Sequence, residues 1–307
     1  MMSNNSLPTF YRLSAEIRRA LELNLPLVAL ESTVITHGLP YPDNLALALD
    51  MENEIRQRQA IPATIAVLDG FIHVGLQPEQ IEPLAHGQGM YKISTRDFAP
   101  AISKGRSGGT TVAGTMLAAH TAGIRVFATG GIGGVHRQPS YDVSADLPQL
   151  ARTPMIVVCA GAKAILDLPA TLEYLETYAV PVVGYQTDEF PAFYSRESGL
   201  KASLRLDSPE EIAVLAKNHW ALGMSSAILV AAPLPEDVAL PAASVAGAIE
   251  QALQECEEKQ VRGQQVTPFL LQRVTELTGG ASLRANLDLL KNNARLGADI
   301  ARALVQD

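Results

Sequence analysis

The sequence predicts a three-layer α/β/α protein: a large mixed, mainly parallel sheet with helices on both faces, and a helical C-terminal part. Two observations support this. Short, almost wholly apolar runs such as residues 27–30 and 155–159 are typical of strands buried on both faces of a sheet. Segments of helical periodicity alternate with these runs as far as Ala231, and only helical segments follow it. No linker, internal repeat or low-complexity tract interrupts the chain, so we expect one domain spanning residues 1–307.

The composition excludes several classes of protein. Of the 307 residues, 47% are hydrophobic and 18% charged, which allows a large core. The net charge of −8 argues against a nucleic-acid surface, although a small anionic substrate needs only a local positive pocket. Cys159 and Cys256 provide no disulfide framework or zinc-ligand spacing. Because neither a signal peptide nor an apolar run of about 18 residues is present, we expect a cytoplasmic protein that does not associate with membranes.

The expected elements follow from the spacing of apolar residues. Buried strands are predicted at residues 27–30, 125–129, 155–159, 180–184 and 226–231. Helices are predicted at residues 13–23, 44–59, 79–86, 116–122, 169–178, 208–220, 243–259, 267–278 and 282–304. Residues 64–68 and 71–74 flank Asp69-Gly70, which favours a hairpin with a type I′ turn, because both central residues of that turn need positive φ. This hairpin makes the sheet mixed.

Capping residues support three of these helices. Pro169 suits the first position of the helix at 169–178. Ser208 and Glu211, three residues apart, form a capping box. Thr267 is expected to cap the helix that follows it.

Lys163 follows the strand at 155–159 through three small residues, and good helix formers come after it. We therefore expect Lys163 where a strand turns into a helix, at the sheet edge where open α/β sheets bind ligands. Apolar surroundings and the positive end of a helix both disfavour an ammonium group, which would leave the amine able to attack a carbonyl. The alternative is a lysine whose stem packs while its head reaches water.

Other polar residues also follow predicted strands. Glu31 comes directly after residues 27–30 and is a candidate acid or base, or a cap of the following turn. If the strands are parallel neighbours, Glu31, Thr129-Gly130, Lys163 and Gln186 converge on one edge. An acid beside a reactive lysine indicates Schiff-base chemistry on an aldehyde or masked aldehyde. The residues alone thus predict a lyase or glycosidase that acts on a sugar phosphate.

Two glycine-rich turns are candidates for binding the phosphate. Residues 108–115 place glycines and hydroxyls before a helix, where backbone N–H groups can meet an anion, although close packing is an alternative. Four glycines within residues 130–134 imply that the backbone closely approaches a phosphate or another chain segment. Lys92 is either a further anion contact or an exposed strand lysine. Neither turn has the spacing of a P-loop or a dinucleotide fingerprint.

Asp142 and Asp146 are four residues apart, so on a helix they would share a face and repel each other unless a cation lay between them. Oxygen ligands suit Mg²⁺ or Mn²⁺, and the alternative is a solvated acidic turn. The last predicted helix contains Asn286, Asn292 and Asn293. Because asparagine is a poor residue for a helix interior, these three indicate a polar role for one face.

Several long segments match, in order, the segments of one known family. They are residues 28–42, 62–67, 108–114, 129–137, 158–168, 184–193, 267–271 and 280–286. By these segments the chain, from about Leu13 to Ala303, resembles the pseudouridine-5′-phosphate glycosidase family, also called indigoidine synthase A-like. The resemblance implies reversible cleavage of the C–C glycosidic bond of pseudouridine 5′-phosphate into uracil and ribose 5-phosphate. It also implies a divalent metal, typically Mn²⁺, and a homotrimer.

The resemblance further implies residue roles. Lys163 is expected to form a Schiff base at C1′ of the ring-opened ribose, Glu31 to donate the proton that helps open the ring, and Asp142 to bind the metal. The implied substrate contacts are Lys92, Val112, Ser144, Ala145 and Asp146, with Asn286 as a further contact. An iminium at C1′ supplies the electron sink that cleavage of a C–C bond needs. This explains why a lysine replaces the carboxylate pair of ordinary glycosidases.

Two features depart from the family pattern: the segment between Arg137 and Asp142 is short, and Ala232 stands where an asparagine is expected before Pro233. Three other functions stay open. A different Schiff-base lyase or aldolase for a phosphosugar would not release uracil. A ribokinase-like sugar kinase would place an aspartate base near the position of Lys163, which argues against it. A sugar-phosphate-binding protein without activity would show neither turnover nor a lysine adduct.

Overall fold

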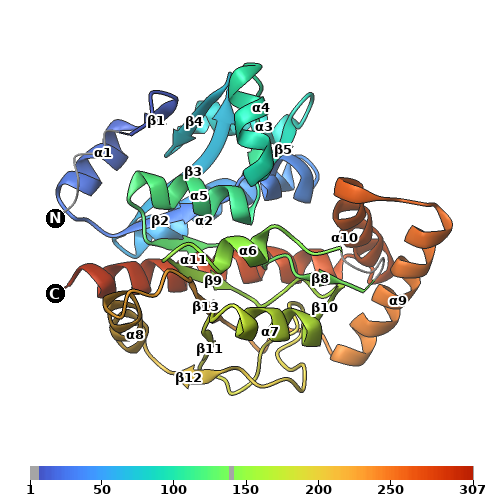
Figure 1. Ribbon diagram of the computed structural model, residues 1–307. Helices are drawn as coiled ribbons and strands as arrows, with labels where there is room; N and C mark the ends of the chain where they lie inside the picture. The colour runs from blue at the N-terminus through green and yellow to red at the C-terminus, as the bar shows by residue number, and fades with distance from the viewer. Residues whose placement is uncertain (1–6, 138–141, 307) are drawn as a thin grey trace.

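The computed structural model describes residues 7–137 and 142–306 (Figure 1). Its strands are β1 (Tyr11–Leu13), β2 (Leu27–Leu30), β3 (Ile61–Leu68), β4 (Phe71–Val74), β5 (Tyr91–Ile93), β6 (Gly108–Thr110), β7 (Val126–Ala128), β8 (Val135–His136), β9 (Ile156–Cys159), β10 (Leu166–Asp167), β11 (Val182–Tyr185), β12 (Leu204–Leu206) and β13 (Ile228–Ala231). Its α-helices are α1 (Ala15–Glu22), α2 (Asp43–Gln57), α3 (Pro78–His86), α4 (Phe98–Ser103), α5 (Val112–Ala122), α6 (Asp146–Leu150), α7 (Leu168–Thr177), α8 (Pro209–Ala221), α9 (Ala242–Glu258), α10 (Val266–Leu277) and α11 (Ala281–Val305).

Eleven of these strands form one mixed, mainly parallel sheet, as the sequence predicts. Its main path is β1-β4-β3-β2-β7-β9-β13-β11-β12, with β6 paired to β3 and β5 paired to β6. All pairs from β3-β2 to β11-β12 are parallel. The second half of β3 pairs antiparallel with β4 and β6. Asp69 and Gly70 have φ values of 50° and 80°, which confirms the predicted hairpin turn between β3 and β4.

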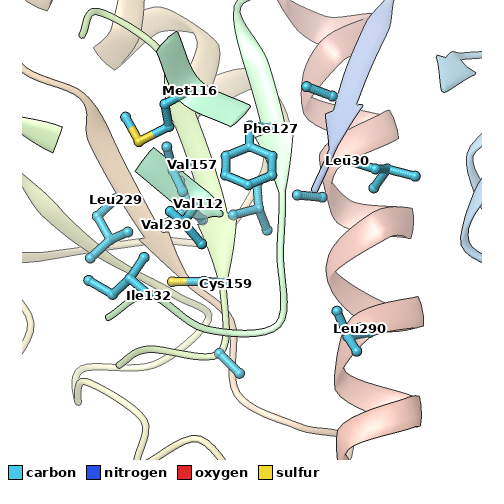
Figure 2. Close-up of a cluster of buried hydrophobic side chains, with 14 of the residues drawn as sticks. Leu30, Val112, Met116, Phe127, Ile132, Val157, Cys159, Leu229, Val230 and Leu290 are labelled. Atoms are coloured by element: carbon cyan, nitrogen blue, oxygen red, sulfur yellow. The ribbon is translucent and has the colours of Figure 1, made fainter. Parts of the chain in front are cut away.

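Helices cover both faces of the sheet, which gives three layers. Figure 2 shows Phe127 of β7 on the same side of the strands as Val112 and Met116 of α5, with α11 on the other side. The residue after Phe127 points toward α11, because a Cβ added at Gly297 of α11 would lie 3.2 Å from the Cβ of Ala128. In the interior, every residue of β9 has an exposed fraction of 0%. Burying each of its large apolar side chains contributes roughly 1.5–3 kcal/mol.

The C-terminal part is helical, as predicted. α11 packs along the sheet and against α2 and α8, whereas α9 and α10 pack on each other beside the sheet (Figure 1). Ser208 and Glu211 form the predicted capping box at the start of α8. Among the described residues, no helix has both the length and the apolar composition to cross a membrane. The segment between Arg137 and Asp142, expected to be short, lies outside the described residues.

One predicted element is wrong. A helix was expected directly after Lys163, but the N–H of Leu166 donates to the carbonyl oxygen of Lys163 at 3.0 Å, and β10 follows. β10 pairs antiparallel with β8, so the backbone here is extended, and α7 begins only at Leu168. Lys163 therefore does not lie at a helix N-terminus.

Candidate active site

A cleft of about 460 Å³ lies where β2, β7 and β9 end. Glu31 follows β2, Gly130 follows the end of β7, and Lys163 follows β9, and all three line the cleft. The convergence predicted for these strand ends is therefore present. Gln186 is an exception: its side-chain amide donates to the carbonyl oxygen of Asp207 at 3.1 Å, and it does not line the cleft. The volume is within the range that suits a small phosphorylated ligand.

The other residues predicted for the site also line this cleft. They are Lys92, Val112, Asp142, Ser144, Ala145, Asp146 and Asn286. Phe193, from the aromatic stretch after β11, forms part of the wall. The sequence carried no specific signal for His37 and Arg96, which line the cleft as well. Ala232, where an asparagine was expected, is buried and does not line the cleft.

Two hydroxyl groups hold the Glu31 carboxylate. Thr129 Oγ1 donates a hydrogen bond to Glu31 Oε1 at 2.5 Å, and Thr33 Oγ1 donates to Glu31 Oε2. Because these partners are hydroxyls rather than N–H groups of the following turn, the contacts favour a chemical role over a capping role. The two hydrogen bonds fix the orientation of the Glu31 carboxyl group. Glu31 is only half-buried and lines the cleft. Such a group is suited to proton transfer.

Lys163 and Lys92 bring two cations into the cleft. Burial lowers the pKa of the Lys92 ammonium, and the positive charge of Lys163 lowers this pKa further, while Asp146 and Glu31 oppose the shift. The four charged groups therefore lie close enough to influence one another. A second cationic group nearby is one of the arrangements that activate a lysine amine as a nucleophile.

The Asp146 carboxylate joins two backbone segments. Its Oδ1 accepts a hydrogen bond from the Ala113 N–H at 2.9 Å, and its Oδ2 accepts one from the Gly133 N–H at 2.7 Å. A Cβ at Gly133 would lie 2.2 Å from Ser144 Oγ, so only glycine allows this approach. The glycines of residues 130–134 thus lie against other segments of the protein, which was one of the two possibilities that the sequence left open.

The start of α5 offers a place for an anion. The Thr111 hydroxyl caps this helix by accepting a hydrogen bond from the Gly114 N–H at 3.2 Å. The Asp146 carboxylate accepts the hydrogen bond from the Ala113 N–H. Among the described residues, the N–H of Val112 has no hydrogen-bond partner, and Val112 lines the cleft. A free N–H at a helix N-terminus, together with the Lys92 ammonium, suits a phosphate group.

Asp142 and His136 are the residues best placed for a metal ion. Their backbones are joined by a hydrogen bond from the His136 N–H to the Asp142 carbonyl oxygen at 2.9 Å, and both residues line the cleft. Burial lowers the pKa of His136, and the nearby Asp142 carboxylate opposes that shift. Asp142 and Asp146 do not lie on one helix, because α6 begins at Asp146, so the shared helix face that their spacing would allow does not form.

The donor set limits what kind of metal site can form here. No group of three or more His, Cys, Asp and Glu side chains in the described part of the chain is arranged to hold a metal ion. The carboxylate of Asp142 is the kind of oxygen donor through which Mg²⁺ and related hard cations bind while keeping water or substrate oxygens as their other ligands.

The chain is similar over nearly its whole length to proteins of one known family. Residues 16–303 match the family model "Indigoidine synthase A like protein". A pseudouridine-5′-phosphate glycosidase of Dinoroseobacter shibae is 56% identical over 97% of this chain and 98% of its own length. One of Caldanaerobacter subterraneus is 52% identical over 95% and 96%.

Two solved structures are also similar. The prealnumycin C-glycosynthase AlnA, determined in complex with ribulose 5-phosphate, has a TM-score of 0.89 and 40% identity over 97% of this chain and 98% of its own. An indigoidine synthase A-like protein of Thermotoga maritima has a TM-score of 0.91 and 33% identity over the full length of both chains.

Proposed function

This chain belongs to the indigoidine synthase A-like family, and we propose that it is an enzyme that reversibly cleaves the C–C glycosidic bond of pseudouridine 5′-phosphate into uracil and ribose 5-phosphate. The observation that carries the proposal is the meeting of Lys163, Glu31 and an anion-binding helix start in one cleft. The names of the relatives support the substrate, and the C-glycosynthase neighbour supports chemistry on a pentose phosphate.

Lys163 supplies the nucleophile of the proposed reaction. In the direction of synthesis, its amine condenses with the aldehyde of ring-opened ribose 5-phosphate, and water leaves. The iminium carbon C1′ accepts an electron pair from C5 of uracil, and C5 then loses its proton. The 4′-oxygen closes the ring by displacing the lysine amine. Cleavage reverses these steps, and Glu31 gives the ring oxygen its proton as the ring opens.

The remaining residues of the cleft bind and orient the substrate in this proposal. Lys92 and the free N–H of Val112 bind the phosphate. Ser144, Ala145 and Asn286 contact the sugar. Asp146 contributes to this surface mainly by shaping it, because its two carboxylate oxygens accept backbone hydrogen bonds from other segments.

A divalent cation, Mn²⁺ in this proposal, would be held by Asp142 with His136 close by. When bound, it would supply positive charge to the site. The carboxylate donor of Asp142 suits manganese. Lys163, Glu31 and Lys92 carry out attack, proton transfer and phosphate binding, respectively.

We also propose that the enzyme acts in the cytoplasm as a homotrimer of single-domain subunits. Both cysteines, Cys159 and Cys256, are free thiols in the structure, which suits a reducing compartment. Light scattering coupled to size-exclusion chromatography measures the oligomeric state directly, and the mass of three 32.8 kDa chains is the expected result.

The activity itself is tested by incubating the protein with ribose 5-phosphate, uracil and Mn²⁺ and following pseudouridine 5′-phosphate by mass spectrometry. Its formation is the expected result, with none in the Lys163→Ala variant. If the protein binds ribose 5-phosphate but forms no C-nucleotide with uracil, this proposal is wrong. In that case a parallel reaction replaces uracil with aromatic carbon nucleophiles and tests whether the protein joins the sugar to another acceptor. The similarity to a C-glycosynthase favours this second activity.

A further inference from the structure

Asn293 is a polar residue on the apolar face of α11. Its exposed fraction is 0%, and Leu289 and Leu290 on the preceding turn are buried too. Figure 2 shows Leu290 on the side of α11 that faces the strands. One turn further on, Gly297 lies against Val28 and Ala128, so the helix packs closely on the sheet here. An asparagine at such a position needs a partner for its amide.

The Asn293 amide binds the backbone where β7 leaves the sheet. Its Nδ2 donates to the carbonyl oxygen of Thr129 at 2.8 Å and to that of Gly130 at 3.4 Å. The Thr129 N–H still bonds to the carbonyl oxygen of Val158 at 2.9 Å, as in a sheet. The Thr129 carbonyl lies beyond the last residue of β7, and Asn293 provides the donor that a neighbouring strand would otherwise supply.

Thr129 also holds Glu31. Its hydroxyl donates to Glu31 Oε1 at 2.5 Å, so one residue receives a hydrogen bond from α11 on its main chain and gives one to the carboxylate through its side chain. The Asn293 Oδ1 is buried and has no hydrogen-bond partner among the described residues. A leucine would fill the same space without an unpaired acceptor, so packing does not account for the amide.

We propose that Asn293 is a positioning residue for the Glu31 carboxyl group and acts through Thr129. The effect on turnover rests on the proposed function, whereas the effect on the surroundings of the Glu31 carboxyl group does not. Four variants separate the contacts. Asn293→Leu removes the amide at similar size, and Thr129→Val removes the hydroxyl at the same shape. Thr129→Ser keeps the hydroxyl, and Asn292→Leu makes the same change at the half-buried neighbouring asparagine, which does not line the cleft.

In the synthesis assay, Asn293→Leu should lower kcat roughly tenfold or more with little change in the KM for ribose 5-phosphate, because a small displacement of a catalytic group has an effect of this size. The pH profile of kcat should move in the same direction in Asn293→Leu and Thr129→Val, and Thr129→Ser should restore it. The kcat of the double variant Asn293→Leu, Thr129→Val should fall by less than the product of the two single fold-decreases, since both substitutions act on the same contact with Glu31. Asn292→Leu should retain the wild-type profile.

A second measurement is independent of turnover. The carbon-13 chemical shift of the Glu31 carboxyl, identified by its loss in Glu31→Gln, is compared at one pH between the wild type and each variant. The chemical shift should change in Asn293→Leu in the same direction as in Thr129→Val. An unchanged chemical shift in Asn293→Leu overturns this inference, whether or not the wild type makes pseudouridine 5′-phosphate. Absence of product with the wild type, by contrast, contradicts only the proposed function. If Asn293→Leu does not fold, Asn293→Ala takes its place in both measurements.

Discussion

Asp146 and Gly133 are joined by a hydrogen bond of 2.7 Å, in which the backbone N–H of Gly133 donates to Oδ2 of the carboxylate. The other oxygen accepts the N–H of Ala113 at 2.9 Å. One buried side chain, with an exposed fraction of 5%, thus sets the spacing between the start of α5 and the glycine-rich loop after β7. In our account these two segments form opposite parts of the substrate surface, and their spacing determines the shape of the cleft.

Asp146→Asn tests this arrangement. The amide has one acceptor oxygen, so one backbone N–H loses its partner and meets an NH₂ group instead. We expect the free energy of unfolding to fall by about 1–3 kcal/mol. We also expect kcat/KM to fall roughly tenfold or more, because the loop shifts. Urea unfolding and the synthesis assay measure the two effects.

Asp167→Asn is the matched control for that variant. Asp167 caps α7 by accepting the Ala170 N–H at 3.0 Å, and asparagine caps helices equally well. Asp167→Asn should therefore change neither the free energy of unfolding nor kcat/KM. Equal stability and activity in Asp146→Asn and Asp167→Asn would contradict the role given to Asp146.

Gly161 lies between β9 and Lys163 and should not tolerate a side chain. Its φ is +90°, and an added Cβ would lie 2.4 Å from the Pro191 carbonyl oxygen. Gly161→Ala should therefore lower the free energy of unfolding by about 2 kcal/mol or more, from backbone strain and overpacking together. Gly199→Ala measures the strain alone, since Gly199 has a φ of +74° and open space around it. Equal losses in the two variants would show that the contact with Pro191 is unimportant.

The charge of Lys92 should make substrate binding sensitive to pH. Burial and the charge of Lys163 lower the Lys92 pKa from its ordinary value of 10.5. The ammonium form exists below that pKa and is lost as the pH rises through it. The KM for ribose 5-phosphate should therefore begin to rise at a lower pH than it would if an exposed lysine with an ordinary pKa bound the phosphate.

Lys92→Arg is the test of this pH dependence, because a guanidinium stays charged throughout the range. In this variant the rise in KM with pH should flatten. Steady-state kinetics on both proteins from roughly pH 7 to 10, the range in which lysines with lowered pKa values titrate, make the comparison. The same rise in both proteins would mean that another group controls binding.

Removal of the metal tests the role of Asp142. Chelation should suppress turnover, and Mn²⁺ should restore it. Asp142→Asn should raise the Mn²⁺ concentration needed for half-maximal activity by about tenfold or more. Asp188→Asn, which changes an exposed carboxylate outside the cleft, should leave that concentration unchanged. A metal requirement unaffected by Asp142→Asn would place the cation elsewhere.

The elements that the sequence predicts well are those with a strong local pattern. β2 is observed at residues 27–30 as expected, and β9 differs from its predicted range by one residue, because each is a fully apolar run bounded by turn residues. β5 and β12 have three residues each and partly exposed side chains, so they carry too little periodicity to predict. The helix expected after Lys163 failed because Ala164 and Ile165 form a turn and Leu166 begins β10. Ile165 and Leu166 are both buried in this arrangement, so tertiary packing overrides local propensity there.

The same distinction applies to the site. The positions of Glu31 and Lys163 are predictable because Glu31 follows a buried strand directly and Lys163 follows one through three small residues. The bond between Glu31 and Thr129 joins residues 98 positions apart, and nothing in the local sequence specifies it. The sequence also singled out three asparagines in the last helix without separating them. The structure places Asn286 in the cleft and Asn293 against the backbone of Thr129, whereas Asn292 has neither contact.

The proposed reaction depends on a Schiff base between Lys163 and the sugar, which borohydride trapping detects as a stable adduct. The protein is incubated with ribose 5-phosphate and Mn²⁺, reduced, and examined by mass spectrometry as the intact chain and as peptides. We expect one reduced sugar-phosphate adduct on the peptide that contains Lys163, retained in Lys92→Ala under saturating substrate and absent in Lys163→Ala. No adduct despite demonstrated binding of ribose 5-phosphate, or an adduct on Lys92 instead, would exclude Lys163 as the nucleophile.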